Sequence, residues 1–159
     1  MITHCPKDDL LVSYSAGALG ESWSLAVGSH VHLCKEFSDD VALGEKIGGS
    51  LLSDLAPIAL EKSLDALLDR LGDQEPIGEA VNQEQDALIP SPLCDYIGDS
   101  LDDLEWSMVG NGITQHLIET SDSGQARLLR IPSGTALPEH EHSGRELTLV
   151  ISGGYKDDS

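Results

Sequence analysis

Between residues 8 and 71 the apolar positions recur at helical spacing. The clearest stripe has offsets of 0, 4, 7, 8 and 11, which is one face of an amphipathic helix, and it consists of Trp23, Val27, His30, Val31 and Cys34. Glycine, proline and serine residues at the ends of such stripes divide the segment into four short helices. The pattern therefore predicts a small four-helix bundle over residues 1–72.

Two of these helices have clear expected boundaries. Ser38, which two aspartates follow, is typical of a helix start, and Gly48-Gly49 is expected to end that helix. The fourth helix is expected to begin near Pro57 and to stop at Gly72. Its apolar face consists of Leu60, Leu64, Leu67, Leu68 and Leu71. This face either packs onto the other helices or binds a partner protein, and the sequence leaves both interpretations open.

Further along the chain the apolar period becomes two, which predicts β-strands. The runs are ITQHLIET (113–120), ARLLRI (126–131) and ELTLVI (146–151), and the turn-forming segments between them favour antiparallel pairing. Residues 73–91 are acidic and interrupted by proline and glycine, so we expect a solvated linker there. The predicted fold class is α+β, with a helical domain over 1–72 and a β domain over 92–159.

Charge narrows the choice of partners. The 159-residue chain has nine Lys and Arg against 28 Asp and Glu, for a net charge of −19. So acidic a chain repels nucleic-acid phosphates and anionic membrane surfaces. No apolar run approaches the roughly 20 residues that span a bilayer, and the start of the chain lacks the pattern of a signal peptide. We therefore expect a cytoplasmic protein that binds neither nucleic acid nor membrane directly.

Histidine and cysteine at the end of the second predicted helix form a first candidate metal site. His30 and Cys34 lie one turn apart on the same face, so a nitrogen and a sulfur could share one tetrahedral ion. His4 and Cys5 could add ligands, because a bundle brings the start of the first helix near the end of the second. Zinc suits this mixed set of nitrogen and sulfur ligands. The alternative is that His30 and Cys34 are ordinary core residues.

A second candidate metal site lies near the end of the sequence. His140 and His142 are two positions apart, so on a strand both side chains point the same way, and Glu146 follows after a short turn. Two imidazoles and a carboxylate suit zinc, and also divalent iron, manganese or nickel. A histidine-bearing acidic surface loop is the alternative.

The helical part resembles a known family. Residues 4–37, HCPKDDLLVSYSAGALGESWSLAVGSHVHLCKEF, are similar to the N-terminal domain of zinc-binding anti-sigma factors of the ChrR type. The pattern of that family is an early histidine followed by His-x3-Cys-x2-Cys. His30 and Cys34 match the second histidine and the first cysteine of this pattern.

Two positions of the family pattern are altered or ambiguous in this chain. The early ligand falls on His4 or Cys5 according to a one-residue choice of alignment, and Phe37 stands where the last cysteine is expected. The resemblance then implies zinc held weakly by three ligands, a different use of His4 and Cys5, or no zinc in the helical domain.

Residues 92–159 resemble the first part of the cupin-like domain that follows in the same family. The segment Gly134-x5-His140-x-His142-x3-Glu146-x6-Gly153 matches the first cupin motif. The second motif and the closing strands of a cupin lie further downstream, so the resemblance implies a partial antiparallel barrel that ends at Ser159. The unpaired edges of such a sheet favour homodimerisation through the barrel.

The resemblance implies an anti-sigma factor. The helical domain would bind and inhibit a sigma factor of the extracytoplasmic-function class, with the leucine face as a candidate partner surface. The cupin-like part would sense an oxidative signal through its metal and release the sigma factor. The acidic chain complements the basic surfaces with which sigma factors meet DNA and polymerase. The alternative function is a cupin metalloenzyme of the dioxygenase or isomerase class, but no further acid, base or nucleophile accompanies the histidines.

Overall fold

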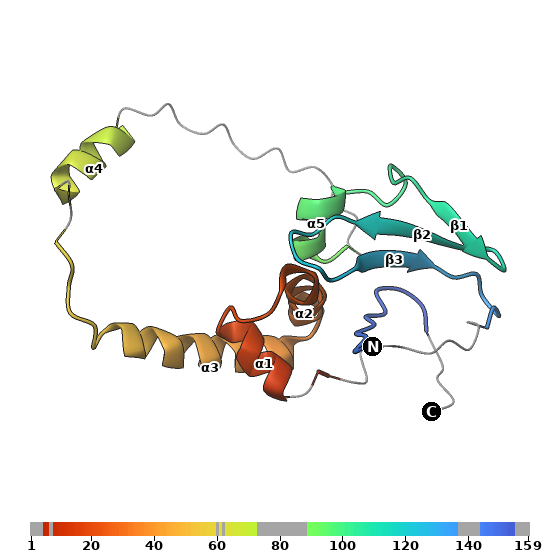
Figure 1. The fold of residues 1–159 in the computed structure, drawn as a ribbon, viewed down its shortest axis with the longest axis horizontal. Helices are drawn as coiled ribbons and strands as arrows, with labels where there is room; N and C mark the ends of the chain where they lie inside the picture. The colour runs from red at the N-terminus through yellow and green to blue at the C-terminus, as the bar shows by residue number, and fades with distance from the viewer. Residues whose placement is uncertain are drawn as a thin grey trace.

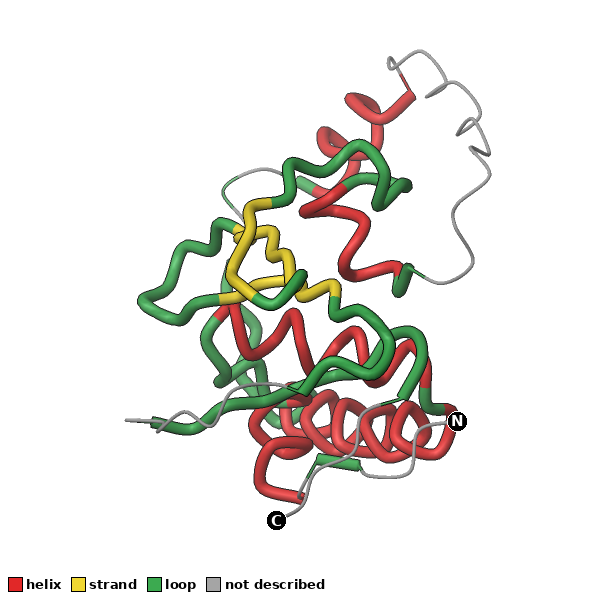
Figure 2. The backbone as a smooth tube through the Cα atoms, turned by 90° about the vertical axis from the view of Figure 1, so that its right-hand side faces the viewer, coloured by secondary structure: helices red, strands yellow, loops and turns green. Residues whose placement is uncertain are grey.

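Helix α2 (Glu21–Leu33) lies at the centre of the molecule, between the neighbouring helices and a small sheet (Figure 1 and Figure 2). The computed structural model of the chain describes residues 5–6, 8–59, 61, 63–72, 89–136 and 144–154. Helix α2 contacts α1 and α3 on one side and α5 and β3 on the other. The helical part and the β part are therefore packed against each other through α2.

The described residues form five helices and one sheet. The helices are α1 (Asp8–Ser15), α2 (Glu21–Leu33), α3 (Lys35–Leu52), α4 (Leu64–Gly72) and α5 (Ser91–Ile97). The strands are β1 (Ser107–Gly110), β2 (Ile113–Ile118) and β3 (Ala126–Arg130), and they form an open antiparallel sheet in the order β1-β2-β3. The expected α+β class with a partial cupin-like sheet is confirmed. Among the described helices, none combines the length and the apolar character needed to cross a bilayer.

The predicted helix boundaries differ from the observed ones for local reasons. Only Cys34, in an extended conformation, separates α2 from α3, so α3 begins before Ser38. It also continues through Gly48-Gly49 to Leu52. Helix α4 begins well after Pro57, because the Ser63 hydroxyl accepts a hydrogen bond from the Ala66 amide at 3.2 Å and so acts as the N-cap.

Strands β2 and β3 lie where the alternating pattern predicts them. Their register pairs Thr114 with Arg130 and Ile118 with Ala126. Strand β1 was not predicted. It joins β2 through a two-residue turn in which Asn111 and Gly112 have positive φ angles of 51° and 77°. These angles are those of a type I′ turn, whose twist matches that of a hairpin.

The prediction of a third strand over 146–151 is wrong. These residues form neither helix nor strand, although alternate side chains are partly buried as in a strand. Leu147 packs against the core that α2 and α3 share, and Ile151 packs against the core between α2 and the sheet. Partly buried and exposed side chains therefore alternate along 146–151 as predicted, but the segment packs its apolar residues against the two cores and does not pair with a described strand.

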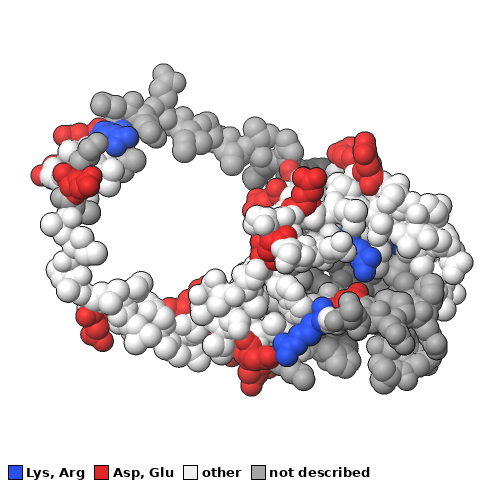
Figure 3. All heavy atoms as spheres, in the orientation of Figure 1, with Lys and Arg blue, Asp and Glu red and all other residues white. Residues whose placement is uncertain are grey.

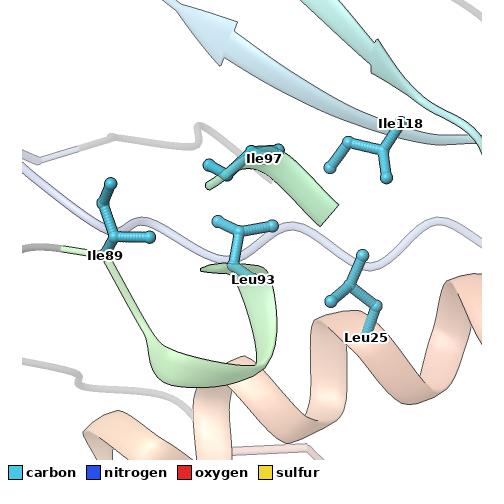
Figure 4. Close-up of a cluster of buried hydrophobic side chains, with 5 residues drawn as sticks. All are labelled: Leu25, Ile89, Leu93, Ile97 and Ile118. Atoms are coloured by element: carbon cyan, nitrogen blue, oxygen red, sulfur yellow. The ribbon is translucent and has the colours of Figure 1, made fainter. Parts of the chain in front are cut away.

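Two apolar cores hold the fold together. The first comes from α2, from α5 and the residue two positions before it, and from β2, and it consists of Leu25, Ile89, Leu93, Ile97 and Ile118 (Figure 4). The second joins Val27 of α2 to Phe37 and Val41 of α3. Since Leu25 and Val27 point into different cores, α2 is buried on both sides. Ile89 and Pro90, at the end of the range expected to be a linker, are also buried.

The start of α2 is bound to the turn between β2 and β3 by hydrogen bonds. The Glu21 carboxylate accepts bonds from the Ser121 amide and hydroxyl and, at 2.7 Å, from the Tyr96 hydroxyl. The Asp122 carboxylate accepts bonds from the Ser22 amide at 3.2 Å and the Ser22 hydroxyl at 2.9 Å. A residue of the β part thus provides the N-terminal cap of a helix in the helical part.

These carboxylates make the contact sensitive to acid. The hydrogen bonds from Ser121 lower the pKa of Glu21 from its usual 4.5, and the bond from Thr120 lowers the pKa of Asp122 from its usual 3.8. Depressed pKa values stabilise the fold above the unfolded-state values, and this stabilisation is lost as the pH falls through the folded-state values. Lowering the pH from about 5 to about 3 should therefore reduce the free energy of unfolding less in Glu21→Gln than in the wild type.

Urea unfolding over that pH range measures this difference. The matched control is Glu119→Gln, at an exposed glutamate that precedes the same turn. If both variants follow the pH dependence of the wild type, the Glu21 contact does not contribute in the way described.

Candidate functional site

Cys5, His30 and Cys34 come together where the stretch before α1 meets the junction of α2 and α3. One ligand atom from each residue lies within 4.8 Å of the other two. His30 is in the last turn of α2, Cys34 links α2 to α3, and Cys5 lies in the stretch before α1. The sequence prediction that the start of the chain reaches the end of the second helix is thus correct for Cys5. His4, the alternative early ligand, lies outside the described residues.

The three side chains fit a mixed nitrogen and sulfur metal site. Two sulfur ligands on a tetrahedral zinc ion are about 3.8 Å apart, given zinc–sulfur bonds of about 2.3 Å. The Cys5 and Cys34 Sγ atoms are 3.9 Å apart. His30 Nε2 is buried and has no hydrogen-bond partner among the described residues, which is costly for a polar atom unless a ligand is present. The placement of Cys5, His30 and Cys34 therefore suits a metal ion with mixed nitrogen and sulfur ligands.

The protonation of the cluster follows from its surroundings. Burial lowers the pKa of His30, so the imidazole is neutral at pH 7 and a ring nitrogen keeps a free lone pair. Desolvation, together with the hydrogen bond to Cys34, raises the pKa of the Cys5 thiol. A metal would have to displace the thiol protons, so its affinity should fall as the pH is lowered.

Phe37 is a core residue at the position where the family pattern has a fourth ligand. Its ring is 4% exposed, packs with Val27 and Val41, and meets the His30 ring edge-on at a centroid distance of 5.0 Å. A hydrocarbon side chain therefore lies beside His30 where a thiolate would complete the site. The described residues offer three ligands here.

Part of the C-terminal segment lies against this cluster. A cavity of about 140 Å³ is lined by Cys5 and His30 and, on the other side, by Leu147, Thr148 and Leu149. Arg145 also pairs with Asp9 of α1 at 3.8 Å. The residues that follow the cupin motif thus contact the helical part next to the Cys5, His30 and Cys34 cluster.

The second predicted metal site is only partly described. His140 and His142 lie outside the described residues, and Glu146 is exposed at the start of the segment that contacts the helices. The prediction that these three residues hold a metal therefore remains a prediction.

The leucine face of α4 is exposed. Leu64, Leu67 and Leu68 are 59%, 52% and 52% exposed, while Leu60 and the side chain of Leu71 lie outside the described part of the chain. All four expected helices are present, but α4 stands apart from the other three (Figure 1). Of the two interpretations of this face, packing onto the other helices is not observed for its described residues.

The exposed apolar surface extends beyond the predicted leucines. Its further members, from the distal half of α3 and the stretch after it, are Ile47, Leu51, Leu52, Leu55 and Ile58. We call these five residues, with Leu64, Leu67 and Leu68, the aliphatic arm. Part of this surface could have been predicted from the sequence, because Leu43, Ile47 and Leu51 recur every four residues, as on one face of a helix. Figure 3 shows the outer part of α3 as mostly uncharged, with acidic side chains on α4.

Comparisons with known proteins agree with this architecture. Residues 97–159 match the family model described as the ChrR cupin-like domain. The chain is 40% identical to the anti-sigma-E factor ChrR of Cereibacter sphaeroides over 159 residues, which cover 99% of this chain and 74% of the relative.

A solved structure is also similar. It is the crystal structure of Rhodobacter sphaeroides SigE in complex with the anti-sigma ChrR, and the matched chain has a TM-score of 0.75 and 36% identity. The match covers 91% of this chain and 73% of the other. With a matching C-terminal domain, a relative of this identity along nearly the whole sequence and the same arrangement of helices and sheet, the chain belongs to the ChrR family of anti-sigma factors.

Proposed function

We propose that this chain binds a sigma factor of the extracytoplasmic-function class through the aliphatic arm and keeps it from RNA polymerase. The observation that carries the proposal is the exposure of the arm, in which every member is more than half exposed. Large apolar side chains that are exposed along one helix face are unfavourable in water, and such faces often bind other proteins. The relatives named above are anti-sigma factors, and one structure contains SigE.

The arm suits a partner that binds amphipathic helices in an apolar groove. Leu64, Leu67 and Leu68 follow the spacing of one helical face, and Ile47 and Leu51 do the same on α3. Burial of a leucine side chain contributes about 2 kcal/mol, so a few such residues supply most of the affinity of an interface.

Charge supports the same class of partner. With a net charge of −19, the chain attracts proteins with basic surfaces and accelerates their association at low salt. A sigma factor needs basic surfaces to meet DNA. Co-purification of the full chain with such a sigma factor from the native cell tests this proposal directly.

We further propose that the β part senses an oxidative signal through a divalent metal, with zinc as the first candidate, held by His140, His142 and Glu146. Such an ion would supply a site whose ligands change in charge or occupancy on oxidation. Glu146 adjoins Leu147, which packs against Val27, Phe37 and Val41. A shift at the ligands would therefore act on a segment that contacts the helical core.

Replacing His140 and His142 with alanine should remove one equivalent of metal per chain, because two of three ligands are lost. Elemental analysis of the purified protein measures the metal content. The matched control is His116→Ala, since His116 on β2 bonds through Nδ1 to the Glu105 carbonyl at 3.0 Å and is no part of the motif. Unchanged metal content in the double variant would show that the histidines do not hold the ion.

A further inference from the structure

We propose that the turn between β2 and β3, residues 119–125, is a joint that makes the helical part and the β part unfold as one unit. Asp122 in this turn binds Ser22 at the start of α2, which lies 100 positions away in the sequence. The residue before α2 is Gly20, which has no side chain to cap the helix. Asp122 takes the place of the missing cap, so the start of α2 depends on a residue of the β part.

Hydrogen bonds within the turn orient the Asp122 carboxylate. The Thr120 hydroxyl donates to one of its oxygens at 2.8 Å, while the amide and hydroxyl of Ser22 donate to the other. The Thr120 hydroxyl also lies 3.4 Å from the carbonyl oxygen of Gly124, on the other side of the turn. Because the turn itself holds the carboxylate in position, little conformational freedom is lost when it binds α2.

Two glycines allow the turn and the helix to approach closely. A Cβ atom added at Gly20 would lie 3.4 Å from the Asp122 Cγ and closer still to a carboxylate oxygen. A Cβ atom added at Gly124 would lie 2.9 Å from the Ser22 Cβ and closer still to the Ser22 hydroxyl. Neither glycine has a positive φ angle, so the close approach, and not the backbone conformation, requires glycine here. A side chain at either position would push the turn and α2 apart.

The joint adds direction to the apolar contact between the two parts. Leu25 of α2 and Ile118 of β2 belong to one core, but apolar packing is not directional, whereas hydrogen bonds are. The far end of α2, about 20 Å away, carries His30, and only a cavity lies between His30 and Leu147 of the C-terminal segment. The start of α2 is therefore its fixed end, and a disturbance of the sheet would reach the helices through the joint.

The two tryptophans of the chain report on the two parts separately. Trp23 lies near the start of α2, Trp106 lies directly before β1, and both are half-buried. The full-length variants Trp106→Phe and Trp23→Phe therefore each keep one fluorescent probe. With the joint intact, urea unfolding followed by fluorescence should give the same midpoint for both proteins. This measurement requires neither a bound metal nor a sigma factor.

Adding Asp122→Ala to each of these proteins should separate the midpoints, with the Trp23 midpoint lower by about 0.5 M urea or more. Asp122→Asn should separate them less, because the asparagine oxygen still accepts hydrogen bonds from Ser22. Gly124→Ala should also separate them, since its methyl group displaces Ser22. The matched controls are Asp103→Ala, at an exposed aspartate of the β part, and Gly154→Ala, where nothing lies within 4 Å of the added Cβ. Both controls should leave the midpoints equal.

Two outcomes would overturn the proposal. Midpoints that already differ with the joint intact would mean that the two parts unfold independently. Midpoints that stay equal in Asp122→Ala, whether both fall or neither does, would mean that another contact couples the parts. Circular dichroism without urea establishes that each variant is folded, and if Asp122→Ala is not, Gly124→Ala decides between the same two results.

Discussion

Aspartate at Leu64 or Leu67 will weaken binding of the sigma factor by roughly a hundredfold or more, because it places a charge in an apolar interface. Both side chains are more than half exposed in the free chain, so neither substitution removes a core contact. The free energy of unfolding should therefore remain within about 0.5 kcal/mol of the wild-type value. Titration calorimetry or co-purification with the sigma factor measures the loss.

The matched control is Leu117→Asp. Leu117 lies on β2 and is 58% exposed, nearly the same as Leu64 at 59%, but it belongs to the β part. We expect this variant to bind as the wild type does. If Leu64→Asp and Leu117→Asp bind equally well, the interface lies elsewhere on the molecule.

Phe37→Cys should raise the affinity of the helical site for zinc by roughly a hundredfold. Structural zinc sites contribute on the order of 10 to 16 kcal/mol, which is about 3 kcal/mol for each of four ligands. Phe37 meets the His30 ring at 5.0 Å, so a cysteine at this position would be close to the cluster. Competition with a chelator of known affinity measures the change.

The same substitution should destabilise the metal-free protein by about 3 kcal/mol, since a buried phenyl ring is removed from the core. Phe37→Ala is the control, because it also removes the phenyl ring from the core but adds no ligand. Zinc should therefore restore stability to Phe37→Cys and not to Phe37→Ala. Equal zinc affinity in the wild type and both variants would mean that the ligand set differs from Cys5, His30 and Cys34.

The secondary structure was predicted most reliably where it depends on residues that are neighbours in the sequence. The strands at 113–118 and 126–130 follow from alternation, because side chains two apart share one face of a strand. The hairpin between β1 and β2 could have been predicted as well, since Asn-Gly at 111–112 is a strong signal for a type I′ turn. Helix α4 starts at Leu64 because Ser63 is its N-cap. The prediction placed this start near Pro57, since proline is also common in the first turn of a helix.

The site was predictable to the extent that two of its residues are close in the sequence. His30 and Cys34 are four positions apart, and they stay close although α2 ends at Leu33 and Cys34 is extended. The distances along the sequence do not tell which residue before α1 lies near His30 and Cys34. The position of Cys5 there depends on how the start of the chain packs against α2. Three of the eight residues of the aliphatic arm were predicted, because helical periodicity identifies an apolar face but not what covers it.

By itself, the sequence determined the net acidic charge, the α+β class, the positions of β2 and β3 and the proximity of His30 to Cys34, and the last three depend on residues close together in the chain. Only the tertiary structure decided that α2 is buried on both sides, that Asp122 caps it, that residues 146–151 pack on helices and that α4 stands apart. The physical reason is that an apolar or charged side chain can be satisfied by several partners, and long-range packing selects among them.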